Sequence, residues 1–395
     1  MSRRRIAAFA VFATLITAVV VVAKPAAVNA ATAPNADVRV PMDPSEILEK
    51  SQGQPVRRKG RAAAPTVEEA VSLAQAEIDA GRASGDPRAL GRAKAALGGH
   101  WDDPAAPASV VLLRATILQS LHEFERADAE LTGLLARSPE NDQARLTLAT
   151  IRTVRADYKY AETECPKLSD ALSAAVCLGN AWSLTGRSAA AEVKVGEALG
   201  TLGQGGAPRT RAEIVWAISS LGEYAERQGA RDRAEAYYRK ALQVSPSDPY
   251  VLRAYADLLL DLGRPAEVLP LLASYTEQDA LLLRVVVAKK RLGQTGAVTV
   301  ARDLAERFAA VRLRGDRAHL REESWYEREI VGDAARALTL AQENWSVQRE
   351  PADARVFLEA ARAKGDLAAA APVRALLAET HLEDPTLLTL ARSTP

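Results

Sequence analysis

The chain has 395 residues, with 51 Lys and Arg against 50 Asp and Glu, which gives a formal net charge of +1 at pH 7. Hydrophobic residues make up 48% and charged residues 26%, which excludes a disordered chain. Near-neutrality argues against a nucleic-acid binder, whose affinity depends on neutralising phosphates. Only 5% of residues are aromatic, and Ala, Leu and Arg are abundant, so we expect helices.

The N-terminus has the order of features typical of an export signal. Three arginines, Arg3 to Arg5, precede an uncharged apolar run at 6–23, and small residues follow up to Ala30. This pattern predicts a secretory signal peptide over residues 1–30. The alternative is an uncleaved anchor, because eighteen apolar residues just span a bilayer, and residues 6–23 would then be the membrane contact. In both cases the body lies outside the cytoplasm, periplasmic or extracellular. Residues 31–65 are rich in Ala and Pro and predict a flexible leader.

A pattern of large and small residues follows in the middle of the chain. It runs Ile218, Leu221-Gly222 and Ala225, and then continues with three further positions: Ala234, Tyr238 and Pro246. This spacing resembles the tetratricopeptide repeat, a helix–turn–helix unit of 34 residues in which small residues let two helices approach and Pro ends the second. The resemblance implies that residues 66–395 form an all-α, right-handed solenoid of about eight such hairpins, because each pair needs a neighbour to complete its core.

Glycines mark the turns of further copies. A Gly followed five residues later by a small or apolar residue occurs at Gly186, Gly229, Gly263, Gly293, Gly332 and Gly365. Two earlier copies, around Ala127 and Ala161, keep the rest of the pattern without the Gly, and a weaker first unit has Gly85 at its turn. The segment from Gly200 to Arg211 interrupts the pattern and predicts a hinge or an exposed loop.

Catalytic motifs are absent from the sequence. The four histidines, His100, His122, His319 and His381, are scattered, and no Gly-rich phosphate loop or Gly-x-Ser-x-Gly elbow occurs. The stretch GGHWDDP at 98–104 gathers His, Trp and two acids, but an Asp capping a turn before Pro104 is the simpler interpretation. We therefore expect no enzyme activity, no metal and no cofactor.

The two cysteines fall on adjacent helices of the predicted array. Cys165 lies on the second helix of one unit, and Cys177 lies on the first helix of the next. Antiparallel helices joined by a short turn bring such positions together, and an exported protein suits a disulfide. We predict a structural Cys165–Cys177 bond; the alternative is two buried thiols in tight helix contacts.

The family resemblance also implies a function. Tetratricopeptide proteins typically hold a peptide or partner domain in a concave groove lined by the first helix of each pair. By the family pattern the partner-binding side chains would be Asn180, Trp216, Tyr250, Arg253, Asp257, Tyr326 and Arg355, with Ser183, Glu223, Glu329 and Glu359 also facing inward. A lining of mixed charge with aromatics suits a protein or peptide better than a phosphate polymer. We expect a scaffold for envelope proteins; the alternative is an accessory subunit of an envelope enzyme or polysaccharide-export complex.

Overall fold

The computed structural model describes residues 65–86, 88–201, 209–313 and 317–392. Every regular element in these ranges is helical. The predicted signal peptide, the possible anchor at 6–23 and nearly all of the leader at 31–65 lie outside the described residues. None of the helices within these ranges has the length and apolar character needed to span a bilayer.

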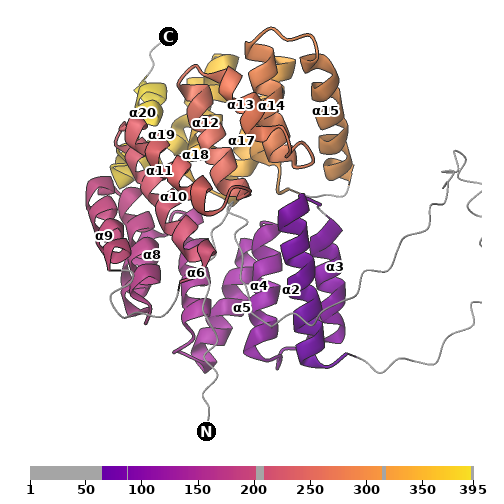
Figure 1. The fold of residues 1–395 in the computed structure, drawn as a ribbon, viewed down its shortest axis with the longest axis vertical. Coiled ribbons are helices and arrows are strands. Elements are labelled where there is room, and N and C mark those ends of the chain that lie inside the picture. Colours follow the sequence, from indigo (N-terminus) through magenta and orange to yellow (C-terminus); the bar gives the residue numbers. More distant parts are fainter. Residues whose placement is uncertain (1–64, 87, 202–208, 314–316, 393–395) are drawn as a thin grey trace, which may run out of the picture.

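The helices follow one another as antiparallel pairs (Figure 1). The pairs are α2 (Val67–Ser84) with α3 (Arg88–Leu97), α4 (Ala108–Ser120) with α5 (Phe124–Arg137), α6 (Asp142–Val154) with α7 (Tyr158–Glu164), α8 (Ala171–Ser183) with α9 (Ser188–Gly200), α10 (Arg211–Arg227) with α11 (Arg231–Val244), α12 (Pro249–Asp261) with α13 (Pro265–Leu272), α14 (Asp279–Arg291) with α15 (Ala297–Leu313), α16 (Leu320–Tyr326) with α17 (Ala334–Val347), and α18 (Pro351–Lys364) with α19 (Ala371–Thr380). A last helix, α20 (Pro385–Arg392), follows them. Short turns of other helix types are η1 (Gly98–Trp101), η2 (Cys165–Lys167), η3 (Glu327–Val331) and η4 (Leu367–Ala370). The predicted all-α array of helical hairpins is confirmed.

The turn glycines explain where each first helix ends. All seven glycines that mark turns in the sequence have positive φ, as at Gly229 with +73° and Gly332 with +86°. Glycine adopts this left-handed conformation without the steric penalty that a Cβ imposes. In the two copies that lack the Gly, His122 (φ 58°) and Ala156 (φ 70°) take the same position. The turn geometry is therefore kept even where the residue type is not.

The small residues of the repeat lie where two helices touch. Gly222 in α10 faces the ring of Tyr238 in α11, and a Cβ on Gly222 would stand 2.5 Å from the Tyr238 Cε1 atom. Ala225 and Ala234, the next small positions, are fully buried in the same hairpin. This close approach is the physical reason for the Leu-Gly and Ala-x3-Tyr spacing.

The stretch GGHWDDP is a structural turn. Asp103 Oδ1 accepts a hydrogen bond from the Ala105 amide at 2.9 Å, which confirms the predicted cap before Pro104. The carbonyl oxygens of Trp101 and Asp103 each accept a bond from Arg114 Nη1 at 2.9 Å. Within the described residues no group of three or more His, Cys, Asp or Glu side chains is placed to hold a metal ion.

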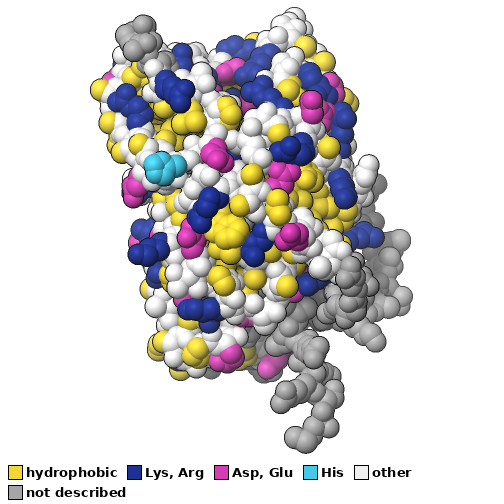
Figure 2. All heavy atoms as spheres, turned by 90° about the vertical axis from the view of Figure 1, so that its left-hand side faces the viewer, with side chains coloured by type: hydrophobic (Ala, Val, Ile, Leu, Met, Phe, Trp, Pro, Cys, Tyr) yellow, Lys and Arg dark blue, Asp and Glu magenta, His cyan; other side chains and the backbone are white. Residues whose placement is uncertain are grey.

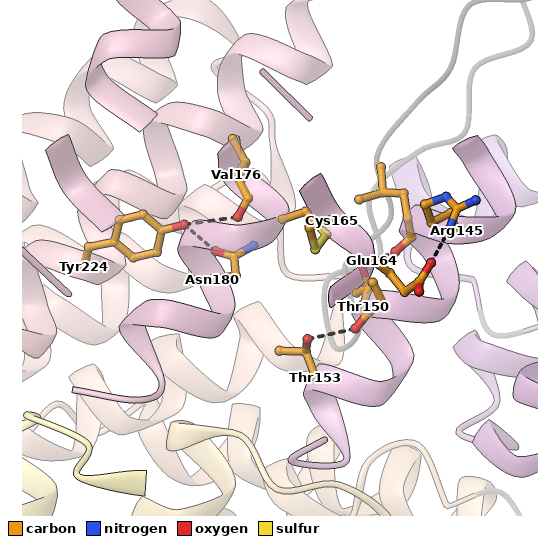
Figure 3. Close-up of a disulfide and its surroundings, with 11 residues drawn as sticks. Arg145, Thr150, Thr153, Glu164, Cys165, Val176, Asn180 and Tyr224 are labelled. Atoms are coloured by element: carbon orange, nitrogen blue, oxygen red, sulfur yellow. Dashed lines mark hydrogen bonds and ion pairs between the residues drawn. A yellow bond between two sulfur atoms is a disulfide. The ribbon is translucent and has the colours of Figure 1, made fainter. Parts of the chain in front are cut away.

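The cysteine pair fastens one hairpin to the next. Cys165 at the start of η2 is bonded to Cys177 in α8, with their Cα atoms 5.6 Å apart. Cys165 is completely buried and Cys177 is nearly so. Figure 3 shows Cys165 beside Glu164 and Thr150, with Tyr224 on the far side of Asn180. The predicted pairing is confirmed.

The C-terminal helices return to the middle of the chain. The Arg349 amide, just before α18, donates to the Val154 carbonyl at the end of α6 at 2.8 Å. The Ser188 amide at the start of α9 donates to Glu383 Oε2 at 3.3 Å. One hydrophobic core includes side chains from 146–224 and from 337–387. The array therefore closes on itself, and its inner faces surround a common space.

Candidate binding cavity

The inner faces of the array line a partly open cavity of about 280 Å³. Its lining comes from the first helices of successive pairs, from α6 through α18, with additions from α11, η3 and α20. This arrangement agrees with the inner surface that the family resemblance implies. The charged lining consists of eight arginines and eight acids: Arg227, Arg231, Arg253, Arg284, Arg291, Arg321, Arg328 and Arg355, with Glu223, Glu226, Asp257, Asp261, Glu329, Glu350, Glu359 and Asp384.

The outer surface also carries charged side chains of both signs. On the face seen in Figure 2, which is the left-hand side of Figure 1, basic and acidic side chains alternate with apolar ones. No single sign dominates that face, so it exerts no strong long-range attraction on a ligand of one charge. The concentration of charge around the cavity is the more informative feature.

The cavity brings together five of the seven predicted binding residues: Asn180, Tyr250, Arg253, Asp257 and Arg355. The other two are elsewhere. Trp216 is 5% exposed and packs in the core between the middle and C-terminal units. Tyr326 is 7% exposed, donates its hydroxyl to the Ala301 carbonyl at 3.0 Å, and packs edge-on against Phe308. Burial of these aromatic rings contributes to stability and removes both from the set of inward-facing candidates.

Three of the five cavity residues already have strong partners. Asn180 accepts a hydrogen bond from the Tyr224 hydroxyl at 2.7 Å (Figure 3). Asp257 accepts two bonds from Arg284, at 2.8 and 2.7 Å. Arg355 donates two bonds to Asp261, at 2.5 and 2.6 Å, and so ties α18 to α12 across the cavity. These pairs hold the wall of the cavity in place.

Arg253 is different, since no carboxylate among the described residues forms an ion pair with it. Its guanidinium lies over the Tyr250 ring, 5.2 Å from the ring centre. Burial lowers the pKa of Arg253, and the positive charges of Arg321 and Arg284 lower it further. Both neighbours are themselves engaged, Arg284 with Asp257 at 2.7 Å and Arg321 with Asp353 at 3.2 Å. The carboxylates of Glu322 and Asp257 act on the Arg253 pKa in the opposite direction, although neither forms an ion pair with its guanidinium.

Glu226 is the acidic counterpart, and the sequence pattern did not point to it. Burial raises its pKa well above the ordinary value, and the like charges of Glu223, Asp261, Asp257 and Asp384 add to the effect. Its neighbour Arg227 is occupied by Glu223 at 2.8 Å and by the Ser183 hydroxyl at 2.7 Å. Within the described residues, no cation forms an ion pair with the Glu226 carboxylate.

We expect Glu226→Gln to stabilise the free protein by about 0.5–2 kcal/mol at neutral pH, because it removes a poorly solvated charge from an acidic neighbourhood. A carboxyl whose folded pKa is raised weakens the fold above that pKa and costs nothing below its unfolded pKa. The gain of the variant over the wild type should therefore be full at high pH and vanish below about 4.5, the ordinary glutamate pKa. Denaturant unfolding of both proteins between pH 4 and 9 measures this difference, and a gain that does not change with pH would contradict it.

Comparisons with known proteins bear on the repeat itself. Residues 225–282, from the end of α10 into α14, match the model of the tetratricopeptide repeat family. No match was found among curated proteins. Solved structures that match include a tetratricopeptide repeat protein from Parabacteroides merdae ATCC 43184, at 15% identity, covering 74% of this chain and 98% of that chain with a TM-score of 0.37. Another is the TPR domain of P58(IPK), at 15% identity, covering 82% of this chain and 96% of that chain with a TM-score of 0.24.

The family match stands on the segment that holds Ala225, Ala234 and Tyr238, where small residues allow a helix pair to close. The same hairpin recurs along the described chain, with a residue of positive φ at its turn. Residues 225–282 of this chain are therefore identified as a tetratricopeptide repeat.

Proposed function

We propose that this chain is a non-catalytic protein-interaction scaffold of the cell envelope, which holds a segment of a partner protein at the cavity. The tetratricopeptide fold is typical of protein-interaction scaffolds. The observation that carries the proposal is the charged cavity, in which the inner helices of successive units present eight arginines and eight acids. A cavity of about 280 Å³ accommodates a few residues and excludes a folded domain.

The envelope location rests on two features of the chain. The order of basic, apolar and small residues in 1–30 is the secretory pattern. A buried disulfide is compatible with an oxidising compartment, since cytosolic thiols are kept reduced. Both features favour a protein that works outside the cytoplasm.

The test is site-specific photocrosslinking in cells that express the chain. A photoreactive residue replaces Tyr250 at the cavity, and a matched control replaces Val298, which is 78% exposed on α15 and does not line the cavity. We expect a short, reproducible set of envelope proteins crosslinked from position 250 and absent from position 298. Equal crosslinking from both positions, or recovery of the chain from the cytosol, would overturn the proposal. Crosslinks to glycan or to one enzyme alone would identify the accessory-subunit role instead.

A further inference from the structure

Two buried hydrogen-bond donors border the cavity without a partner in the part of the chain that the structure describes. They are the Tyr238 hydroxyl on α11 and the Trp325 indole Nε1–H on α16. An unpaired buried polar group costs stability, because the hydration that it loses on folding is not replaced. A bound molecule that supplies the missing acceptors would explain why the fold keeps both groups.

Tyr238 reaches the cavity from behind its wall. It belongs to α11, a second helix, whereas most of the lining comes from first helices. A Cβ on Gly222 would stand 2.9 Å from the Tyr238 Cζ atom, which carries the hydroxyl, so the missing side chain on α10 leaves room for the ring. Glu223 and Glu226 of the same helix line the cavity. Tyr238 is completely buried, and burial raises its pKa well above the ordinary value, so the hydroxyl keeps its proton and can donate.

The Trp325 ring is held in position by its neighbours. The Arg284 guanidinium lies over the ring, 4.8 Å from the ring centre. Arg284 is itself fixed, because it donates two hydrogen bonds to Asp257 at 2.8 and 2.7 Å. A ring held in this way points its N–H in one direction before any ligand arrives, which lowers the entropy cost of binding an acceptor there.

The unpaired buried groups of the lining share one chemistry. Besides Tyr238 and Trp325 they include the Nε–H groups of Arg321 and Arg328, so among the described residues all four are able to donate. The eight arginines and eight acids of the lining cancel in formal charge, and six of the acids form ion pairs with arginines. The lining therefore favours a neutral molecule rich in acceptors over an anion.

We propose that the cavity binds an uncharged stretch of peptide backbone, whose carbonyl oxygens accept hydrogen bonds from the Tyr238 hydroxyl and the Trp325 N–H. A peptide carbonyl only accepts, whereas a sugar hydroxyl must also place its own proton, and most carboxylates of the lining are already engaged by arginines. This inference rests on the proposed scaffold function and gives the chemistry by which the partner segment is held. Because main-chain carbonyls are common to all sequences, the site is expected to accept segments with different side chains.

Tyr238→Phe removes only the hydroxyl and makes the test specific. In the free protein it should leave the melting temperature unchanged or raise it, because the group that it removes has no partner. Tyr255→Phe is the matched control. Tyr255 is also buried but does not line the cavity, and its hydroxyl donates to Glu235 and accepts from Arg239, both at 2.9 Å. Loss of these bonds should lower the melting temperature.

Binding to the full chain is measured by the NMR signal of the Trp325 indole proton, which Trp325→Phe assigns. The probes are N-acetyl-trialanine-amide, which offers carbonyls and no charge, and maltose, which offers hydroxyls. We expect the capped peptide to move the Trp325 signal downfield in a saturable way. Tyr238→Phe should weaken this binding about fivefold or more, and Tyr255→Phe should leave it unchanged.

Three results would overturn the proposal: no saturable shift with the peptide, equal binding by the wild type and Tyr238→Phe, or a loss of melting temperature in Tyr238→Phe as large as that in Tyr255→Phe. A response to maltose alone would also overturn it and would assign the cavity to a glycan. The scaffold proposal fails on a different observation, the crosslinking from position 250. Protein partners crosslinked there despite a failed peptide titration would leave the scaffold function standing and remove only the recognition of carbonyls.

Discussion

Replacing Asp353 by Ala is expected to lower the free energy of unfolding by about 3–5 kcal/mol, because it leaves a buried guanidinium without its main partner. Asp353 in α18 is completely buried in its side chain and lies 3.2 Å from Arg321 Nη1. Its Oδ1 atom also accepts from Asn344 Nδ2 at 2.8 Å and from Gln348 Nε2 at 3.1 Å. Its Oδ2 atom accepts from the Glu350 amide at 2.8 Å and caps the helix.

Denaturant unfolding at pH 7 measures the loss. Asp353→Asn is the informative companion, because it keeps an acceptor at Oδ1 and should cost less than Ala. Asp303→Ala is the control: Asp303 is an exposed acid on α15, and its replacement should change stability by no more than about 0.5 kcal/mol. A cost below about 1 kcal/mol for Asp353→Ala would mean that Arg321 is satisfied by Glu350 and Glu322 alone, which lie 3.3 and 3.5 Å away.

The repeating part of the fold could be predicted from local sequence, because its cause is local. A left-handed turn favours Gly, and close helix contact demands a small residue, so both leave a mark on the chain at a steady interval. The pairing of Cys165 with Cys177 follows from the same regularity, since it joins consecutive helices. Each of these features depends on residues within one or two units of each other.

The closure of the array could not be predicted in this way. The bond from Arg349 to Val154 and that from Ser188 to Glu383 each join residues 195 positions apart. Neither bond could be predicted from the residues around it. Every residue except proline has a backbone amide, and glutamate is common on protein surfaces. The lining of the cavity could not be predicted for the same reason: Asp384 lines it only because the last helix returns to the middle units. Glu226 was missed for a different reason, since the family pattern selected Glu223, one turn earlier on α10, as the inward position.

The two misplaced aromatics show the limit of transferring positions from a pattern. Trp216 lies in the first half of α10, which packs against the neighbouring helices before the helix reaches the cavity. Tyr326 lies at the end of α16, where it turns toward Phe308 of α15. The turn glycines are 30 to 43 residues apart, so the units differ in length. Equivalent positions in two units therefore do not lie equally close to the cavity. A residue's unit could thus be identified from sequence, but its exposure to the cavity could not.

Gly222→Leu is expected to cost about 3 kcal/mol, because the side chain would enter a space already filled by the Tyr238 ring. A Cβ at this position stands 2.5 Å from Tyr238 Cε1 and 2.9 Å from both Cδ1 and Cζ. Tyr238 is completely buried, so a shift of its ring would disturb the packing around it. The hairpin of α10 and α11 would have to separate, and the Ala225 and Ala234 contacts would loosen with it.

Gly133→Leu is the matched control for this substitution. Gly133 lies within α5, is exposed, and has no neighbouring atom within 4 Å of the place that a Cβ would take. There the same change should raise stability by about 0.5–1 kcal/mol, because Leu favours a helix more than Gly does. Opposite signs in denaturant unfolding would show that the repeat keeps Gly222 for helix contact. If both variants gained stability, Gly222 would be no more than a weak helix former, and the close α10–α11 contact would have no energetic role.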